Sequence, residues 1–237
     1  MTSDLIDSWI PFRCRDGFDM RAWWVRPAAP GSLPGILFVY EPFGINPEMK
    51  RVASELAREG YFVMIPDLMQ RGSFFGCIRR LMADLKAEKG RGIDDLLDAR
   101  QALVCRHDVF ADRVAVMGLC MGGGFALILA KTGLFRVSAP FYGEAPVTLD
   151  GACPIVASYG GRDRVTVKAA NRLAQELQRL AIPADFKVYP SAGHSFMTRP
   201  PNLFVAVLGS LFAGAGFDPD AATDSKRRLV AFFREHL

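Results

Sequence analysis

The chain has 237 residues, of which half are hydrophobic and 23% are charged. Its 29 basic and 25 acidic residues give a net charge of +4, and no stripe of basic and aromatic residues is present. These values are typical of a globular protein that buries its core without disulfide support, and they argue against nucleic acid as a partner.

The N-terminal part of the sequence predicts strands and then a helix. Residues 9–26 indicate two strands around an Asp-Gly turn, and the apolar run at residues 35–40 is typical of a strand buried on both faces. Helical spacing of apolar residues follows. Asn46 is the expected N-cap of this helix, Pro47 its first residue and Gly60 its end.

Strands and helices alternate along the rest of the chain. We expect strands at 61–68, 113–118, 136–143, 154–161 and 184–190, and helices at 75–89, 93–105, 121–131, 168–180 and 221–237. This alternation predicts an α/β fold with a mostly parallel central sheet, helices on both faces and an N-terminal antiparallel hairpin. No linker or repeat divides the chain, so we expect a single domain over residues 1–237.

The cysteines and the N-terminus indicate a reducing compartment. The five cysteines form no C-x-x-C pair, and their number is odd. The N-terminal sequence MTSDLIDSWI has neither a basic region nor an apolar core of the kind found in signal peptides. We therefore expect a cytoplasmic protein with free thiols.

One segment, residues 200–217, carries no charged side chain over 18 residues. It is short for a bilayer-spanning helix and contains proline, asparagine and three glycines, so we do not expect membrane insertion. A lid over a pocket, a buried segment or the surface of a homodimer are the three interpretations that the composition allows.

Polar residues that could take part in catalysis follow four of the expected strands. In an open α/β sheet, functional groups gather beyond the carboxyl ends of the strands. The candidates at these ends are Glu41, Cys120, Asp163 and His194.

The segment from Gly118 to Gly122 has the form G-x-C-x-G, with the cysteine where a nucleophile elbow places its reactive residue. Small residues two before and two after the nucleophile are needed because the strained turn crowds them. The following helix directs its unpaired N–H groups toward Cys120, which favours a thiolate. The alternatives are an inert cysteine in a strand–helix turn or a phosphate-binding loop, although the G-K-[ST] ending of a P-loop is missing.

The candidate partners of Cys120 follow it in the chain order of α/β-hydrolases, which is nucleophile, acid and histidine. Asp163 and His194 each lie on a loop after a strand. Of the two other histidines, His107 follows a helix and His236 is the penultimate residue. Only His194 is suitably placed to act as a base.

These motifs resemble those of the dienelactone hydrolase family, a branch of the α/β-hydrolases. The resemblance extends over nearly the whole chain and rests on EPFGINPEMKRVASELAREGYFVMIPDL, GLCMGG, YGGRDRV and AGHSF. It implies an α/β-hydrolase fold and a Cys–His–Asp triad. In this triad Cys120 is the nucleophile, His194 is the general base, and Asp163 orients the imidazole ring.

The resemblance also implies roles for residues around the triad. Glu41 would hold the proton of the resting thiol, although it could instead cap the next helix. The amide of Met121 would donate to the oxyanion. The residue after the glutamate normally supplies the second donor, but here it is Pro42, which has no N–H, so Phe43 becomes the candidate.

Arginines bind the substrate carboxylate in family members that act on dienelactone. Arg199 follows the candidate histidine, and Arg79 and Arg80 are tentative candidates for a second arm, together with Arg71. A role as solvated surface residues fits each of these arginines equally well.

The sequence therefore predicts a hydrolase that cleaves a small lactone or ester through a thioester acyl-enzyme. A carboxylesterase or thioesterase for small neutral esters is an alternative, and a non-catalytic redox-sensing thiol protein is another. The histidines and cysteines lack metal-ligand spacing and no nucleotide-binding motif is present, so we expect neither a metal nor an organic cofactor.

Overall fold

The computed structural model describes residues 4–200, 210 and 213–237. Most of the uncharged segment 200–217 lies outside these described residues. The three interpretations of this segment, as a lid, a buried segment or a homodimer surface, therefore stay predictions. The elements in chain order are β1 (Leu5–Arg13), β2 (Asp19–Pro27), β3 (Leu33–Val39), α1 (Pro47–Arg58), β4 (Phe62–Pro66), the 3₁₀ helix η1 (Leu68–Arg71), α2 (Phe74–Ala87), α3 (Arg91–Val104), β5 (Val109–Leu119), α4 (Met121–Ala130), β6 (Val137–Phe141), β7 (Ile155–Gly160), α5 (Val167–Arg179), β8 (Ala184–Tyr189) and α7 (Pro219–His236).

The strands form one eight-stranded sheet in the order β1-β2-β4-β3-β5-β6-β7-β8. The hairpin β1–β2 is antiparallel, with Leu5 opposite Pro27 and Arg13 opposite Asp19, and β2 pairs with β4 in the same sense. All pairs from β4 to β8 are parallel. This arrangement confirms the expected α/β-hydrolase fold with its N-terminal hairpin.

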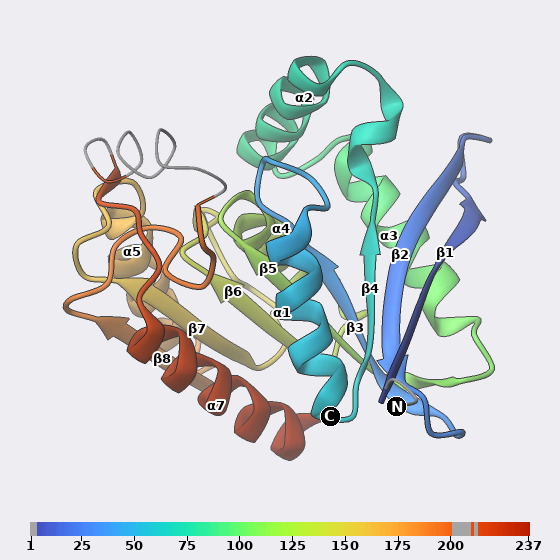
Figure 1. Cartoon of the computed structure of the whole chain (residues 1–237). Coiled ribbons are helices and arrows are strands. Elements are labelled where there is room, and N and C mark those ends of the chain that lie inside the picture. The colour runs from blue at the N-terminus through green and yellow to red at the C-terminus, as the bar shows by residue number, and fades with distance from the viewer. Residues whose placement is uncertain (1–3, 201–209, 211–212) are drawn as a thin grey trace.

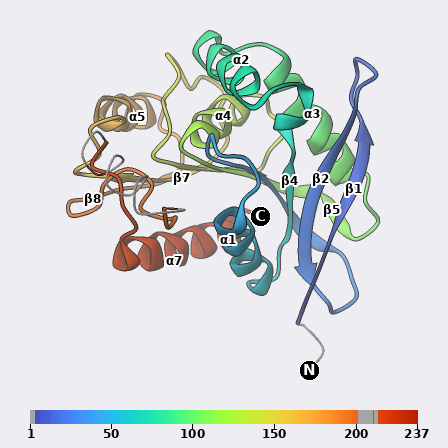
Figure 2. The same ribbon diagram turned by 45° about the horizontal axis from the view of Figure 1, so that its top comes forward.

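Helices cover both faces of the sheet. Helices α1 and α7 pack on one face, whereas α3, α4 and α5 pack on the other (Figures 1 and 2). Asn46 caps α1 as expected, because its side chain accepts from the amides of Glu48 and Met49. Among the described elements, η1 has no counterpart in the sequence analysis, and β5 begins four residues earlier than its apolar pattern indicates.

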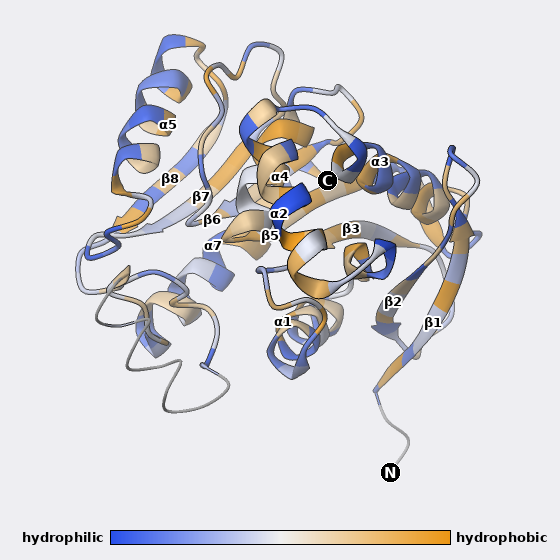
Figure 3. Ribbon diagram, turned by 90° about the horizontal axis from the view of Figure 1, so that it is seen from above, coloured by the Kyte–Doolittle hydropathy of each residue, from blue (hydrophilic) through white to orange (hydrophobic). Residues whose placement is uncertain are grey.

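The hydrophobic residues concentrate at the centre of the molecule, and polar residues lie on outer helices such as α5 (Figure 3). All ten residues of α4 are buried. Helix α2 packs against α4. At this contact the side chain of Leu85 lies against the backbone of Gly124. Among the described helices, none is both long and apolar enough to cross a bilayer.

The turn between β5 and α4 depends on two glycines that allow backbone segments to touch. A Cβ atom on Gly118 would lie 1.9 Å from the carbonyl oxygen of Gly122, and one on Gly122 would lie 2.0 Å from the carbonyl oxygen of Val39. Both of these contacts are with main-chain atoms, so no rotation of a side chain can relieve them. The G-x-C-x-G spacing is therefore a requirement of packing.

We expect Gly122→Ala to destabilise the protein by about 2 kcal/mol or more, because α4 must move away from β3 to admit the methyl group. The midpoint of thermal unfolding should fall by about 4–8 °C. Gly216→Ala is the control, since a Cβ atom there meets no atom within 4 Å. Equal unfolding midpoints for the two variants would contradict this account of the turn.

Candidate active site

Cys120 occupies the corner between β5 and α4. Its backbone has φ 54° and ψ −115°, a left-handed conformation that a non-glycine residue adopts only at a cost. Its amide donates to the carbonyl oxygen of Phe141, which fixes the corner against β6. The side chain of Cys120 is half-buried and makes no capping hydrogen bond to the first turn of α4. The sulfur therefore lies at a helix N-terminus whose first amides are available to an anion.

His194 connects Cys120 to Asp163. Its Nε2 atom lies 3.1 Å from the Cys120 sulfur, and its Nδ1 atom lies 2.8 Å from Oδ2 of Asp163. His194 and Asp163 are both buried. The three side chains predicted from their chain order therefore lie in one hydrogen-bonded row.

The loops after β7 and β8 hold the acid and the histidine in place. The amides of Val165 and Thr166 donate to Oδ1 of Asp163, at 2.7 and 3.0 Å, and the Thr166 hydroxyl donates to Oδ2. The amide of Arg162 donates to the carbonyl oxygen of Ala192, which joins the two loops. Asp163 is thus oriented before it meets the imidazole ring.

The contacts of His194 and Asp163 favour their charged forms. Burial alone would lower the pKa of His194, but hydrogen bonds with Asp163 and Cys120 outweigh it and raise the pKa to about 10. Burial would raise the pKa of Asp163, whereas the hydrogen bonds from His194 and Thr166 lower it. A carboxylate that accepts several hydrogen bonds can hold an imidazolium ion beside it.

Glu41 follows β3 and is buried beside this row. It accepts hydrogen bonds of 3.2 Å from the hydroxyl groups of Tyr142 and Thr198. Burial raises the pKa of Glu41, against the opposing effects of His194 and of these hydroxyls. Among the described residues no hydrogen bond joins Glu41 to the Cys120 thiol, which pairs with His194.

Tyr142 and Thr198 are site residues that the sequence analysis missed. Tyr142 is fully buried, has a positive φ of 39°, and places its ring edge-on to His194 with 5.1 Å between centroids. Tyr142 directly follows β6, but the strand expected at 136–143 includes it, so the rule that functional groups lie beyond strand ends did not single it out. Thr198 lies four residues after His194, in a stretch with no such pattern.

The candidate oxyanion donors differ in their positions. Met121 lines the cavity beside Cys120, as does Pro42. Phe43 does not line it, and 56% of its surface is exposed. The amide of Gly44 donates to the carbonyl oxygen of Glu41, which closes a turn over Pro42. In the part of the chain that the structure describes, the Phe43 amide has no hydrogen-bond acceptor.

The candidate arginines lie outside the cavity that contains Cys120. Arg199 is paired with Glu48 and stacks on the ring of Phe217. Arg79 is exposed, and Arg80 donates to the carbonyl oxygen of Leu68.

Arg71 is buried in a structural role. Its guanidinium binds Asp16 and Asp95, and it lies over the ring of Phe18. The structure therefore brings none of the four arginines to the sulfur of Cys120.

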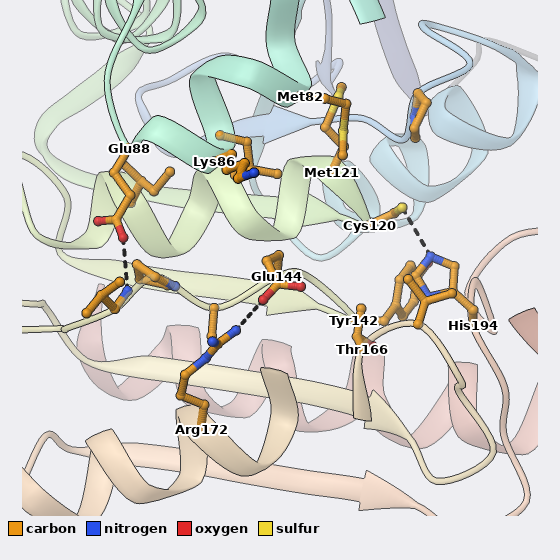
Figure 4. A pocket seen from close by; sticks show the side chains of 17 residues that line it. Met82, Lys86, Glu88, Cys120, Met121, Tyr142, Glu144, Thr166, Arg172 and His194 are labelled. Atoms are coloured by element: carbon orange, nitrogen blue, oxygen red, sulfur yellow. Dashed lines mark hydrogen bonds and ion pairs between the residues drawn. The ribbon is translucent and has the colours of Figure 1, made fainter. Parts of the chain in front are cut away.

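A cavity of about 650 Å³ opens next to the sulfur. Cys120 and His194 lie at one end, and Glu88 lies toward the other (Figure 4). The size is that of a site for a small organic molecule. A buried acid–histidine–thiol row at the end of such a cavity, beside free helix amides, has the parts needed for acyl transfer.

Comparison with known proteins shows the family and the fold of this chain. The model of the dienelactone hydrolase family matches residues 20–237. The carboxymethylenebutenolidase of Rhodococcus opacus is 28% identical over 230 residues, which cover 87% of this chain and 83% of the relative. The structure of a dienelactone hydrolase-like promiscuous phosphotriesterase from metagenomic libraries superposes with a TM-score of 0.82 at 20% identity, covering 99% of each chain. The chain therefore belongs to the dienelactone hydrolase family and is a carboxymethylenebutenolidase-like hydrolase of the carboxylic ester class.

Proposed function

We propose that this hydrolase cleaves a small ester or lactone through a thioester formed on Cys120. The observation that carries the proposal is the row of contacts from the Cys120 sulfur through His194 to Asp163, at 3.1 and 2.8 Å. A thiol needs a neighbouring base to become an effective nucleophile, and a base needs an acceptor that fixes its tautomer. Both conditions are met at this site.

In the first half of the reaction, the Cys120 sulfur reacts as a thiolate, with its proton held on Nε2 of His194, and bonds to the substrate carbonyl carbon. The protonated ring is stabilised by Asp163, in keeping with the raised pKa of His194. When the tetrahedral intermediate collapses, the C–O bond breaks and His194 gives its proton to the leaving oxygen. The acyl group remains on Cys120 as a thioester.

In the second half, His194 takes a proton from water and the resulting hydroxide attacks the thioester carbon. The C–S bond breaks, the carboxylic acid is released and the sulfur recovers a proton from His194. The amide of Met121 holds the oxyanion in both halves, because it lies in the first turn of α4. The Phe43 amide, which has no acceptor among the described residues, is the proposed second donor.

Glu41 serves as a proton store in the substrate-free enzyme in this proposal. Burial raises its pKa, which supports retention of a proton closer to neutral pH than an exposed glutamate allows. Its hydroxyl partners Tyr142 and Thr198 fix its position.

We expect Cys120→Ala to lower kcat/KM for an activated ester such as p-nitrophenyl acetate by a factor of about 10⁴ or more, because no other group can form the acyl-enzyme. Cys105→Ala is the matched control, since Cys105 is an exposed thiol outside the cavity. Mass spectrometry of acid-quenched enzyme should find the acyl group on Cys120. Retained turnover in Cys120→Ala would refute the mechanism.

We expect Glu41→Gln to lower kcat by about 10²-fold and to change the pH dependence of stability. Because the folded-state pKa of Glu41 is raised, its stabilising contribution is complete below its ordinary value of 4.5 and is lost as the pH rises through the folded value. The variant does not suffer this loss. Its free energy of unfolding, relative to the unmodified protein, should therefore increase between pH 4 and pH 8 in denaturant titrations.

Glu48→Gln provides a control of opposite sign. Partial burial would raise the pKa of Glu48, but Arg51 and Arg199 lower it, so its contribution is present above pH 4.5 and disappears in acid. The relative stability of this variant should therefore fall between pH 4 and pH 8. The same trend in both variants would contradict a raised pKa for the buried carboxyl group of Glu41.

A further inference from the structure

The cavity next to Cys120 is elongated along α4. It is lined by Met121 at the start of this helix and by Ile128 near its end, so it extends for about 10 Å at 1.5 Å per residue. Helix α2 forms one wall through Met82 and Leu85. The segment after β6, which carries Glu144, and helix α5, which carries Arg172, form the other wall (Figure 4).

Most of the residues along this groove are apolar. They are Pro42, Met82, Leu85, Met121, Ile128, Ala145, Pro146, Val147 and Val165. Leu85 packs tightly on α4, where a Cβ atom on Gly124 would lie 2.7 Å from its Cδ1 atom. This wall is therefore rigid and offers hydrocarbon contacts over the length of α4.

Most of the charges along the groove are already neutralised. Arg172 forms an ion pair with Glu144, and Glu88 forms one with Lys131 while accepting from the amide of Val147. Lys86 is the one lining cation without an ion-pair partner in the described part of the chain, and its side chain is exposed at the rim. A substrate carboxylate thus meets no pair of free arginines here.

The direction of the substrate follows from the position of His194. The leaving oxygen must approach Nε2 of His194 to receive its proton, and His194 lies on the side of the sulfur opposite the groove (Figure 4). The other substituent of the carbonyl carbon is the acyl chain. It must therefore extend from Cys120 along α4.

We propose that this groove binds the uncharged apolar acyl chain of an ester, and that Met82 is a specificity-determining residue. This inference rests on the proposed role of Cys120 and adds the class of acyl group. An extended hydrocarbon chain displaces water from apolar side chains along the groove, and each added methylene group strengthens binding in the transition state. A terminal carboxylate has to be desolvated against the same side chains.

The test compares p-nitrophenyl acetate, butyrate and octanoate below their aggregation limits. We expect kcat/KM to increase roughly two- to fourfold for each added methylene group while the chain stays within the groove. The mono-p-nitrophenyl ester of octanedioic acid has the same chain with a terminal carboxylate, and it should react at least about tenfold more slowly than the octanoate. Equal rates for acetate and octanoate would overturn the inference.

Two variants on α2 distinguish the effect of a charge inside the groove from the effect of a charge elsewhere on the same helix. Met82→Asp places a charge in the groove and should lower kcat/KM for octanoate at least about tenfold more than it lowers kcat/KM for acetate. Ala83→Asp is the matched control, because Ala83 is exposed and does not line the cavity, and it should leave both substrates unchanged. Equal losses on both substrates in Met82→Asp would count against the groove.

The anionic alternative gives a different pattern. A preference for the carboxylate-terminated ester that disappears in Lys86→Met would replace the inference with an anion site at the rim. Failure of the underlying mechanism is distinguishable from both results, since acetate hydrolysis would then survive in Cys120→Ala.

Discussion

The constraint on which the site depends is the contact between main chains at the turn after β5. Gly118 and Gly122 bring the start of α4 against β3 and against its own strand, at distances that no side chain permits. This packing holds Cys120 in a left-handed conformation with its sulfur outside the sheet. The strain at one residue is thus sustained by the packing of three elements, which keeps Cys120 in one position.

The remaining groups reach the sulfur because parallel strands end at one edge of the sheet. Glu41 follows β3, Asp163 follows β7, and His194 lies just beyond β8. The loops that carry Asp163 and His194 are joined by a main-chain hydrogen bond, and two amides fix Asp163 before it contacts the ring. Distant segments of the chain therefore converge because of strand direction, and local hydrogen bonds supply the final orientation.

Much of this arrangement could be predicted from the sequence, for physical reasons. Apolar periodicity identified the strands and helices, and the chain order of Cys120, Asp163 and His194 matched a pattern that arises from the topology. Periodicity cannot give the environment of a single charged side chain. Arg71 and Arg199 looked equivalent in the sequence, yet one is buried against two aspartates and the other pairs with Glu48. The roles of Tyr142 and Thr198 likewise depend on long-range packing around Glu41.

The contact between Leu85 and Gly124 has a consequence for how the protein can diversify. Helix α2 meets α4 through side chains, whereas the turn at Cys120 is held by main-chain atoms. Substitutions on the inner face of α2 can therefore reshape the wall of the groove while the turn keeps its geometry. The chemical step can in this way stay the same while the range of accepted substrates changes. Substitutions on α2 are therefore a route to altered specificity in engineered variants.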